Sequence, residues 1–203
     1  YANQKLSANE RVDIDSVGSI YWGGEFHDDD IESILDTYSF TAKDVRWEKH
    51  DDVEGKVAEL LADGQVVARF KGRMEFGARA LGNRSILANA SQPNVVRYIN
   101  DIIKSRDFWM PFAPSVLAEY STDYFHKPKS TKACYMVMSF DTIIHKCNSI
   151  FAALHPQDGT ARPQEVYPDD NPEYESLLRK YQSISGDGAI LNTSFNLHGY
   201  PLV

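Results

Sequence analysis

The chain has 203 residues, of which 42% are hydrophobic and 12% aromatic, and its formal net charge at pH 7 is −8. This length and composition are typical of one folded domain with a sizeable core, and they exclude an intrinsically disordered chain. The acidic balance argues against a protein that binds nucleic acid over a broad basic surface. Cys134 and Cys147 are too few for a disulfide framework, and no apolar run reaches the length of a membrane span. We therefore expect a cytoplasmic protein with two reduced thiols and no membrane contact.

Two helices and a strand are predicted in the first third of the chain. Residues 27–38 begin with aspartates and continue with apolar residues at helical spacing. Residues 51–63 show the same spacing and stop at Gly64, a residue that commonly ends a helix. Residues 65–70 then have the pattern of a buried strand.

A third helix is predicted at residues 93–105. It begins with Pro93, which is permitted in the first turn of a helix. Lys104 and Arg106 stand at its C-terminal end, where the helix dipole favours cations. The helix dipole therefore explains these two cations structurally, and the binding of an anionic ligand is the functional alternative.

The second half of the chain alternates between strand and helix patterns. Residues 113–119, 134–142 and 189–196 are predicted strands, and 171–186 is a helix that begins at an asparagine cap followed by proline. Residues 155–172 are rich in Pro, Asp and Gly and are predicted to form a long loop. This alternation favours an α/β fold, with a mixed sheet flanked by helices.

Residues 69–87 hold an unusual density of glycine and arginine directly after the first predicted strand. Glycine lets the backbone approach a bulky ligand, and arginine binds phosphate or carboxylate oxygens in pairs. Residues 71–106 contain seven cations and two acids, a local balance of +5 that leaves −13 for the remainder. A confined basic stretch in an acidic protein favours a small anionic ligand over a polyanion. We therefore predict an anion-binding site here.

Four blocks of this sequence resemble, in order, the C-terminal region of the O-carbamoyltransferases, the enzymes that modify nodulation factors and the secondary metabolites cephamycin and tobramycin. The blocks are GRMEFGARALGNRSIL, INDIIKSRDFWMPFAPSVL, DGTARPQEV and LNTSFNLHGYPLV. The resemblance implies a YrdC-like domain with a mixed twisted sheet over residues 19–203. It also implies that residues 1–18 are a linker or the tail of a preceding actin-like ATPase-superfamily domain. Because the chain ends within an apolar run, we expect this domain to be truncated at its C-terminus.

The resemblance also implies a half-reaction. The domain would bind carbamoyl phosphate and ATP, release carbamate, and join it to AMP as carbamoyl-adenylate, with pyrophosphate and phosphate as products. The preceding domain of the full-length protein would transfer the carbamoyl group to an acceptor hydroxyl. Mg²⁺ is expected to arrive with ATP, since His145, His155 and His198 are too scattered for a metal site of the chain itself. If the chain supplies a carboxylate near this metal, Asp158 is the candidate, because it stands close to Thr160 and Arg162 in the sequence.

Site residues follow from the same blocks. YrdC-type domains carry a Lys-x-Arg pair and a distant Ser-x-Asn, and these places are taken by Lys71-Gly72-Arg73 and Ser194-Phe195-Asn196. The residues with predicted catalytic roles are Lys71, Arg73, Arg106 and Arg162. The residues predicted to bind ATP or carbamoyl phosphate are Arg79, Arg84, Lys104, Thr160, Gln164, Ser194 and Asn196. For Arg79 and Arg84 the alternative is a structural salt bridge in the glycine loop, and for Asn196 an ordinary turn.

Two other functions compete with the enzyme. The first is a non-catalytic YrdC-like module that binds a nucleotide or RNA, and the confined basic stretch argues against RNA. The second is a structural domain whose partner does the chemistry, and the Lys-x-Arg and Ser-x-Asn pairs argue against that. One residue departs from the family pattern: Met110 stands where many members have an arginine, so one cation of the site is missing.

Overall fold

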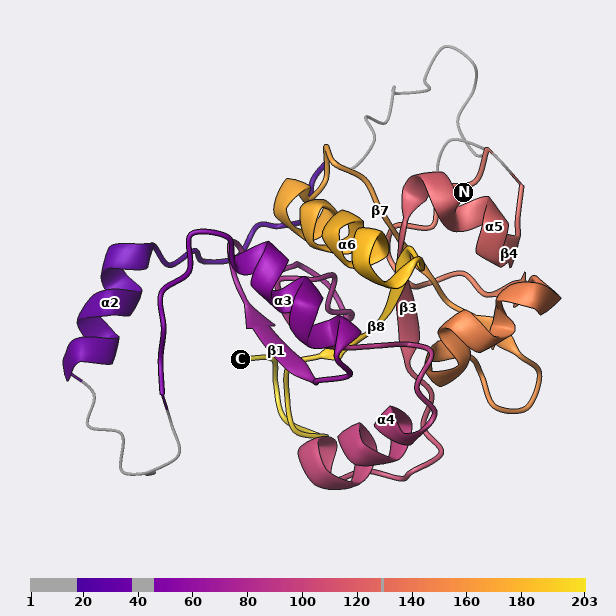
Figure 1. The fold of residues 1–203 in the computed structure, drawn as a ribbon, viewed down its shortest axis with the longest axis horizontal. Coiled ribbons are helices and arrows are strands. Elements are labelled where there is room, and N and C mark those ends of the chain that lie inside the picture. Colours follow the sequence, from indigo (N-terminus) through magenta and orange to yellow (C-terminus); the bar gives the residue numbers. More distant parts are fainter. Residues whose placement is uncertain (1–17, 38–45, 129) are drawn as a thin grey trace, which may run out of the picture.

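The computed structural model describes residues 18–37, 46–128 and 130–203. The predicted tail or linker at residues 1–18 therefore lies outside the described residues, apart from Gly18. The first described helix, α2 (Asp28–Thr37), has no buried residue and stands apart from the rest of the fold (Figure 1). Its position agrees with the predicted helix at 27–38.

Two capped helices cover one face of the main sheet. In α3 (Val53–Ala62) the side chain of Asp52 accepts a hydrogen bond from the backbone N–H of Gly55. In α6 (Pro172–Ser185) the side chain of Asn171 accepts one from the N–H of Tyr174, and the helix ends at Gly186 with a φ of 81°. Both helices begin and end where their cap residues predict.

The main sheet has five strands in the order β1-β2-β8-β3-β7. Neighbouring strands are antiparallel, except that β3 and β7 are parallel, so the sheet is mixed. This confirms the predicted α/β fold with a mixed sheet flanked by helices. The five strands are β1 (Val67–Phe70), β2 (Arg84–Ala88), β8 (Ala189–Ser194), β3 (Ala113–Leu117) and β7 (Gln164–Val166).

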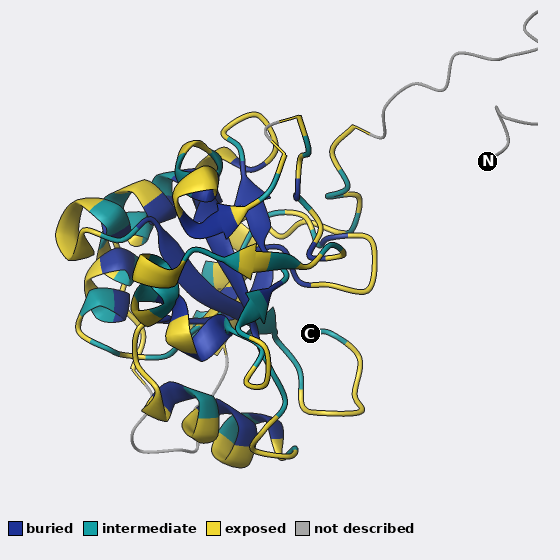
Figure 2. Ribbon diagram, turned by 90° about the vertical axis from the view of Figure 1, so that its right-hand side faces the viewer, coloured by how far each residue is buried: buried dark blue, intermediate teal, exposed yellow. Residues whose placement is uncertain are grey.

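The hydrophobic core lies on both faces of this sheet, as the buried strands in Figure 2 show. On one face, Leu87 and Ile190 pack with residues of α3 and α6. On the other face, Ile86 and Leu191 pack against the segment 90–103 and against η3 (Ile144–Ala153). Strands that are buried on both sides have a continuous apolar pattern in place of alternation.

The remaining elements extend from this sandwich. A second sheet has three short antiparallel strands. Among the helices of the described residues, none has the length and apolar character needed to cross a membrane. The elements not yet named are α4 (Asn94–Arg97), the π-helix η1 (Tyr98–Lys104), η2 (Ala118–Tyr120), α5 (Ser121–Tyr124), β4 (Phe125–His126), β5 (Phe140–Thr142) and β6 (Thr160–Ala161).

The structure corrects three of the predicted elements. The predicted strand at 134–142 is a strand only at Phe140–Thr142. The predicted loop at 155–172 contains β6 and β7, and β7 is an edge strand of the main sheet. The predicted helix at 93–105 is divided between α4 and η1, and it ends at Ser105, whose φ is 51°. This left-handed residue turns the chain so that Arg106 no longer continues the helix.

Candidate anion-binding site

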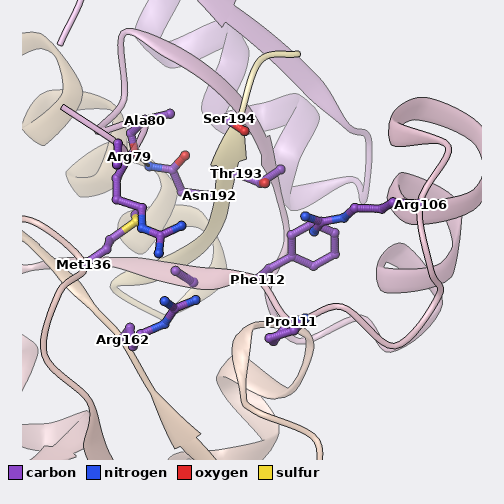
Figure 3. A pocket seen from close by; sticks show the side chains of 12 residues that line it. Arg79, Ala80, Arg106, Pro111, Phe112, Met136, Arg162, Asn192, Thr193 and Ser194 are labelled. Atoms are coloured by element: carbon purple, nitrogen blue, oxygen red, sulfur yellow. Dashed lines mark hydrogen bonds between the residues drawn. The ribbon is translucent and has the colours of Figure 1, made fainter. Parts of the chain in front are cut away.

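Three arginines from distant parts of the chain converge on one cavity of about 100 Å³ (Figure 3). Arg79 comes from the glycine loop between β1 and β2, Arg106 follows η1, and Arg162 joins β6 to β7. The cavity lies where β8 ends and β3 begins, and Phe112 and Asn192 form part of its wall. In Figure 3, Arg79 and Arg162 point toward each other, whereas Arg106 lies over the ring of Phe112.

None of these three arginines forms an ion pair with a carboxylate of the described residues. The arginines that form ion pairs within the described residues are Arg69, Arg73, Arg97 and Arg179, and none of these lines the cavity. Burial lowers the pKa of the Arg162 guanidinium, and the nearby charge of Arg79 lowers it further. Cations held close together without an acid are stabilised by an anion between them.

Arg106 is positioned by the helix that precedes it. Its Nε donates a hydrogen bond to Oδ1 of Asn100 at 2.6 Å, and its guanidinium lies 4.8 Å from the centre of the Phe112 ring. Burial lowers the pKa of this guanidinium. Its Nη2 is buried and has no hydrogen-bond partner among the described residues.

Lys104 joins η1 to the Ser-x-Asn turn that follows β8. Its Nζ lies 2.6 Å from the carbonyl oxygen of Ser194 and 3.0 Å from both the carbonyl oxygen and Oδ1 of Asn196. The side chain is almost fully buried. Burial, together with the nearby charge of Arg106, lowers the pKa of Lys104 to about 8. Lys104 therefore holds the turn in place, and Ser194 brings that turn to the wall of the cavity.

A buried carboxylate organises the glycine loop. Oε1 of Glu75 accepts hydrogen bonds from the backbone N–H groups of Leu81, Asn83 and Arg84, at 2.7, 2.8 and 3.2 Å. The loop is also packed closely, since a Cβ added at Gly82 would lie 2.5 Å from the Tyr174 ring. These contacts fix the part of the chain that carries Arg79.

A network of neutral polar side chains lies behind the cavity and reaches it at Asn192. Gln164 donates from Nε2 to the carbonyl oxygen of Leu81 at 2.8 Å, and its Oε1 accepts from Ser115 and Asn192 at 2.7 and 3.2 Å. Gln164 is thus a support behind the cavity and does not line it. Oδ1 of Asn192 has no partner, although Asn192 is 1% exposed.

A second hollow of about 420 Å³ adjoins the arginine cavity and shares Arg162, Pro111 and Phe112 with it. Thr160 lines this second hollow, together with His155 and Asp158. Met110 lies elsewhere, in an apolar groove with Trp109 and Phe151. The residue that departs from the family pattern is therefore not part of the cavity wall.

Four of the cations predicted to form the site do not line the cavity: Lys104 lies behind Ser194, and the other three have partners elsewhere. The amine of Lys71 pairs with Glu54 at 2.9 Å and with Glu173 at 3.0 Å. The Arg73 guanidinium lies 3.6 Å from the carboxylate of Glu25. Nη1 of Arg84 donates to the carbonyl oxygens of Lys71 and Asn83, at 3.0 and 2.9 Å. Arg84 therefore fastens the base of the loop, and Lys71 is held by carboxylates of α3 and α6.

Of the predicted site residues, the structure brings Arg79, Arg106, Arg162 and Ser194 together at the cavity, with Lys104 and Asn196 directly behind Ser194. The predicted convergence of Lys71, Arg73 and Arg84 on the same cavity is not what the structure shows. Glu75 and Asn192 were missed by sequence reasoning. Glu75 is the only acid of the glycine loop, and Asn192 interrupts an apolar strand, so each carried a signal.

Comparison with known proteins identifies a family and several relatives. The family described as "Carbamoyltransferase C-terminus" matches residues 58–203. The uncharacterized protein MJ1058 of Methanocaldococcus jannaschii is 41% identical over 186 residues, which are 90% of this chain and 30% of that protein. Nodulation protein NolNO of Sinorhizobium fredii is 37% identical over 91% of this chain and 27% of its own length. Nodulation protein U of Rhizobium tropici is 36% identical, over 71% and 24% respectively. The chain spans less than a third of the length of these relatives.

Proposed function

Because this chain belongs to the carbamoyltransferase family, as its C-terminal region, we propose that it binds carbamoyl phosphate and ATP and forms carbamoyl-adenylate. The observation that carries the proposal is the convergence of Arg79, Arg106 and Arg162 on one cavity without a carboxylate to balance them in the described residues. A domain that precedes this region in the full-length protein would then transfer the carbamoyl group to an acceptor hydroxyl.

The size of the cavity supports a small anion as the first ligand. Its volume of about 100 Å³ is below the roughly 300 Å³ at which pockets for drug-sized ligands begin. Carbamoyl phosphate is a compact dianion, whereas ATP needs more space. The adjoining hollow of about 420 Å³ supplies that space, and Arg162 lies between the two.

The side chains suit a reaction that depends on positioning and charge neutralisation. The guanidinium groups of Arg106 and Arg162 would bind phosphoryl oxygens, and Lys104 would hold Ser194 beside them. Carbamate attacks the α-phosphorus of ATP through an oxygen, and pyrophosphate leaves with the electron pair of the broken bond. Arginines that face the leaving groups lower the energy of that step without giving or taking a proton.

Mg²⁺ fits this site only as a companion of ATP. The cavity walls are cationic, and a divalent cation is repelled by arginines unless phosphates lie between them. Among the described residues no carboxylate lines the arginine cavity, so Mg²⁺ would be held by the phosphates of ATP. When bound, Mg²⁺ would neutralise the charge of the phosphates.

The proposal is tested by pyrophosphate exchange, because adenylation is reversible and needs no acceptor. The chain should exchange labelled pyrophosphate into ATP only when carbamoyl phosphate and Mg²⁺ are both present. Arg106→Ala should lower this exchange by a factor on the order of 10², the scale of losing one positioned charged donor. Lys71→Ala is the matched control, since its amine already pairs with Glu54 and Glu173.

Four outcomes would contradict the proposal or its assignment. Exchange without carbamoyl phosphate would exclude the carbamate as the attacking group. Full exchange in Arg106→Ala would show that the arginine cavity takes no part in adenylation. A loss of exchange in Lys71→Ala, with no loss in Arg106→Ala, would place the site at the end of β1, where the sequence predicted it. Binding of RNA that weakens steeply with salt, with no exchange, would favour the non-catalytic alternative.

A further inference from the structure

The loop between η3 and β6 is closed by its own hydrogen bonds. The backbone N–H of His155 donates to the carbonyl oxygen of Thr160 at 2.7 Å, and the N–H of Gly159 donates to that of His155 at 3.0 Å. Oδ1 of Asp158 accepts hydrogen bonds from N and Oγ1 of Thr160, at 3.0 and 2.8 Å. The Asp158 carboxylate is therefore held in one orientation, and these bonds from Thr160 lower its pKa.

This fixed carboxylate faces the imidazole of His155. Nδ1 of His155 lies 3.2 Å from Oδ1 of Asp158. Nδ1 is also shielded from solvent, and the contact with Asp158 lacks the alignment of a full hydrogen bond. A carboxylate at Nδ1 favours the tautomer with its proton there, which leaves Nε2 as a proton acceptor. Contacts of this kind are often misaligned before a substrate binds.

The pair lies beside the proposed substrate cavity. His155, Asp158 and Arg162 line the same hollow, and Arg162 also lines the arginine cavity. The His155 side chain is 42% exposed, so water reaches it. A carboxylate, an imidazole and a phosphate-binding arginine thus surround one space that is open to solvent. This combination is typical of a site that activates a water molecule.

We propose that His155 is the general base that activates water for the hydrolysis of carbamoyl phosphate, and that Asp158 positions it. This inference rests on the proposed function, because carbamoyl phosphate is the substrate assigned there. The oxygen of water forms a bond with the carbonyl carbon while Nε2 of His155 takes one proton. The bond between that carbon and the phosphate oxygen breaks, and the phosphate leaves with the electron pair and takes the second proton of the water. Carbamate and hydrogen phosphate remain, and His155 releases its proton to solvent.

The test separates hydrolysis from adenylation. His155→Gln, made in the full chain, should release phosphate from carbamoyl phosphate more slowly by a factor on the order of 10² or more, after subtraction of spontaneous hydrolysis. In the same variant, exchange of pyrophosphate into ATP should fall by a much larger factor with carbamoyl phosphate than with ammonium carbamate, because carbamate bypasses the step that needs the base. His145→Gln changes an exposed histidine of η3 and should leave both rates unchanged.

Asp158→Asn tests the role of Asp158. The charged groups that line the hollows around His155 are Asp158, Arg162 and Arg97. The variant removes the negative charge that faces Nδ1 of His155, but its amide oxygen can still accept hydrogen bonds from Thr160, so the loop should stay closed. We expect kcat for hydrolysis to fall while KM for carbamoyl phosphate stays at the wild-type value. A merely structural role for Asp158 would lower the melting temperature and leave kcat of the folded variant unchanged.

Each outcome decides between the two proposals. Wild-type hydrolysis in His155→Gln would overturn the role of His155, and so would an equal loss of exchange with carbamoyl phosphate and with ammonium carbamate in that variant. A chain that does not accelerate hydrolysis at all would also overturn it. If hydrolysis depends on His155 but no exchange occurs with either donor, the general base is supported and the adenylation proposed above is wrong.

Discussion

Nζ of Lys104 lies 3.0 Å from Oδ1 of Asn196, a residue 92 positions later in the chain. The other contacts of this amine are also with neutral oxygens, those of Ser194 and the Asn196 carbonyl. The lysine therefore remains a cation close to the arginine cavity while it holds one wall of that cavity. Removing its proton would change both the stability of the chain and the affinity for anions.

The low pKa of Lys104 gives these two properties opposite pH dependences. Its pKa is about 8 in the folded chain and has the ordinary value of 10.5 in the unfolded chain. Between these pH values the unfolded chain binds the proton that the folded chain has lost, so the contribution of Lys104 to the free energy of unfolding rises with pH. The affinity for phosphate should fall over the same range, because a cation near the cavity is lost.

Lys104→Gln provides the control for this prediction. Other side chains titrate above pH 8, so the quantity to compare is the difference between wild type and Lys104→Gln. Denaturant unfolding and calorimetric phosphate binding at pH 7 and pH 9.5 would measure it. A difference that does not change with pH in either measurement would show that Lys104 keeps its proton throughout.

The second prediction concerns the close packing of the glycine loop. Gly82 has a φ of 115°, and an added Cβ would lie 2.5 Å from Cδ1 of the buried Tyr174. We expect Gly82→Ala to lower the free energy of unfolding by about 2 kcal/mol or more, because strain and overpacking add. Gly77→Ala is the control, since its φ is 132° but an added Cβ would meet open space. In thermal denaturation, the melting temperature should fall further for Gly82→Ala than for Gly77→Ala, because only Gly82→Ala adds a clash with Tyr174. Equal losses of stability in the two variants would exclude the clash as a cause.

The third prediction concerns Glu75, whose Oε1 accepts from three backbone N–H groups. Glu75→Ala leaves these donors without a partner, and an unpaired buried donor costs about 1–3 kcal/mol. We therefore expect a large loss of stability and a loss of phosphate affinity, because the loop that carries Arg79 is released. Glu75→Gln keeps one acceptor oxygen and should lose less of both. Denaturant unfolding of the two variants measures their free energies of unfolding. Wild-type stability in Glu75→Ala would show that Glu75 does not hold the glycine loop in place.

Much of the fold could be predicted from the sequence because its signals are local. The apolar spacing of residues 51–63 with the stop at Gly64 predicts α3, the cap at Asn171 predicts the beginning of α6, and the structure confirms both helices. The resemblance to the O-carbamoyltransferases is also confirmed. Strands β2 and β7 were not predicted, since each is three to five residues long and buried throughout, without an alternating pattern.

The site was harder to predict because it depends on contacts between distant residues. The chain has two Lys-x-Arg sequences, at 71–73 and at 104–106, and nothing local distinguishes them. In the structure, Lys104 contacts the Ser-x-Asn turn, whereas Lys71 pairs with Glu54 and Glu173. Which lysine meets a carboxylate is decided by the packing of α3 and α6 on the sheet. Whether Lys71 and Arg73 act in catalysis stays a prediction, and the exchange assay tests it for Lys71.

Binding of the phosphate of carbamoyl phosphate by Arg79, Arg106 and Arg162 is tested most directly by a crystal structure of the chain with phosphonoacetamide. In this stable analogue a methylene group replaces the bridging oxygen. We expect density for the phosphonate within hydrogen-bond distance of the guanidinium groups of Arg106 and Arg162. Density beside Lys71 and Glu173, or an empty arginine cavity at a concentration that saturates binding in solution, would contradict it.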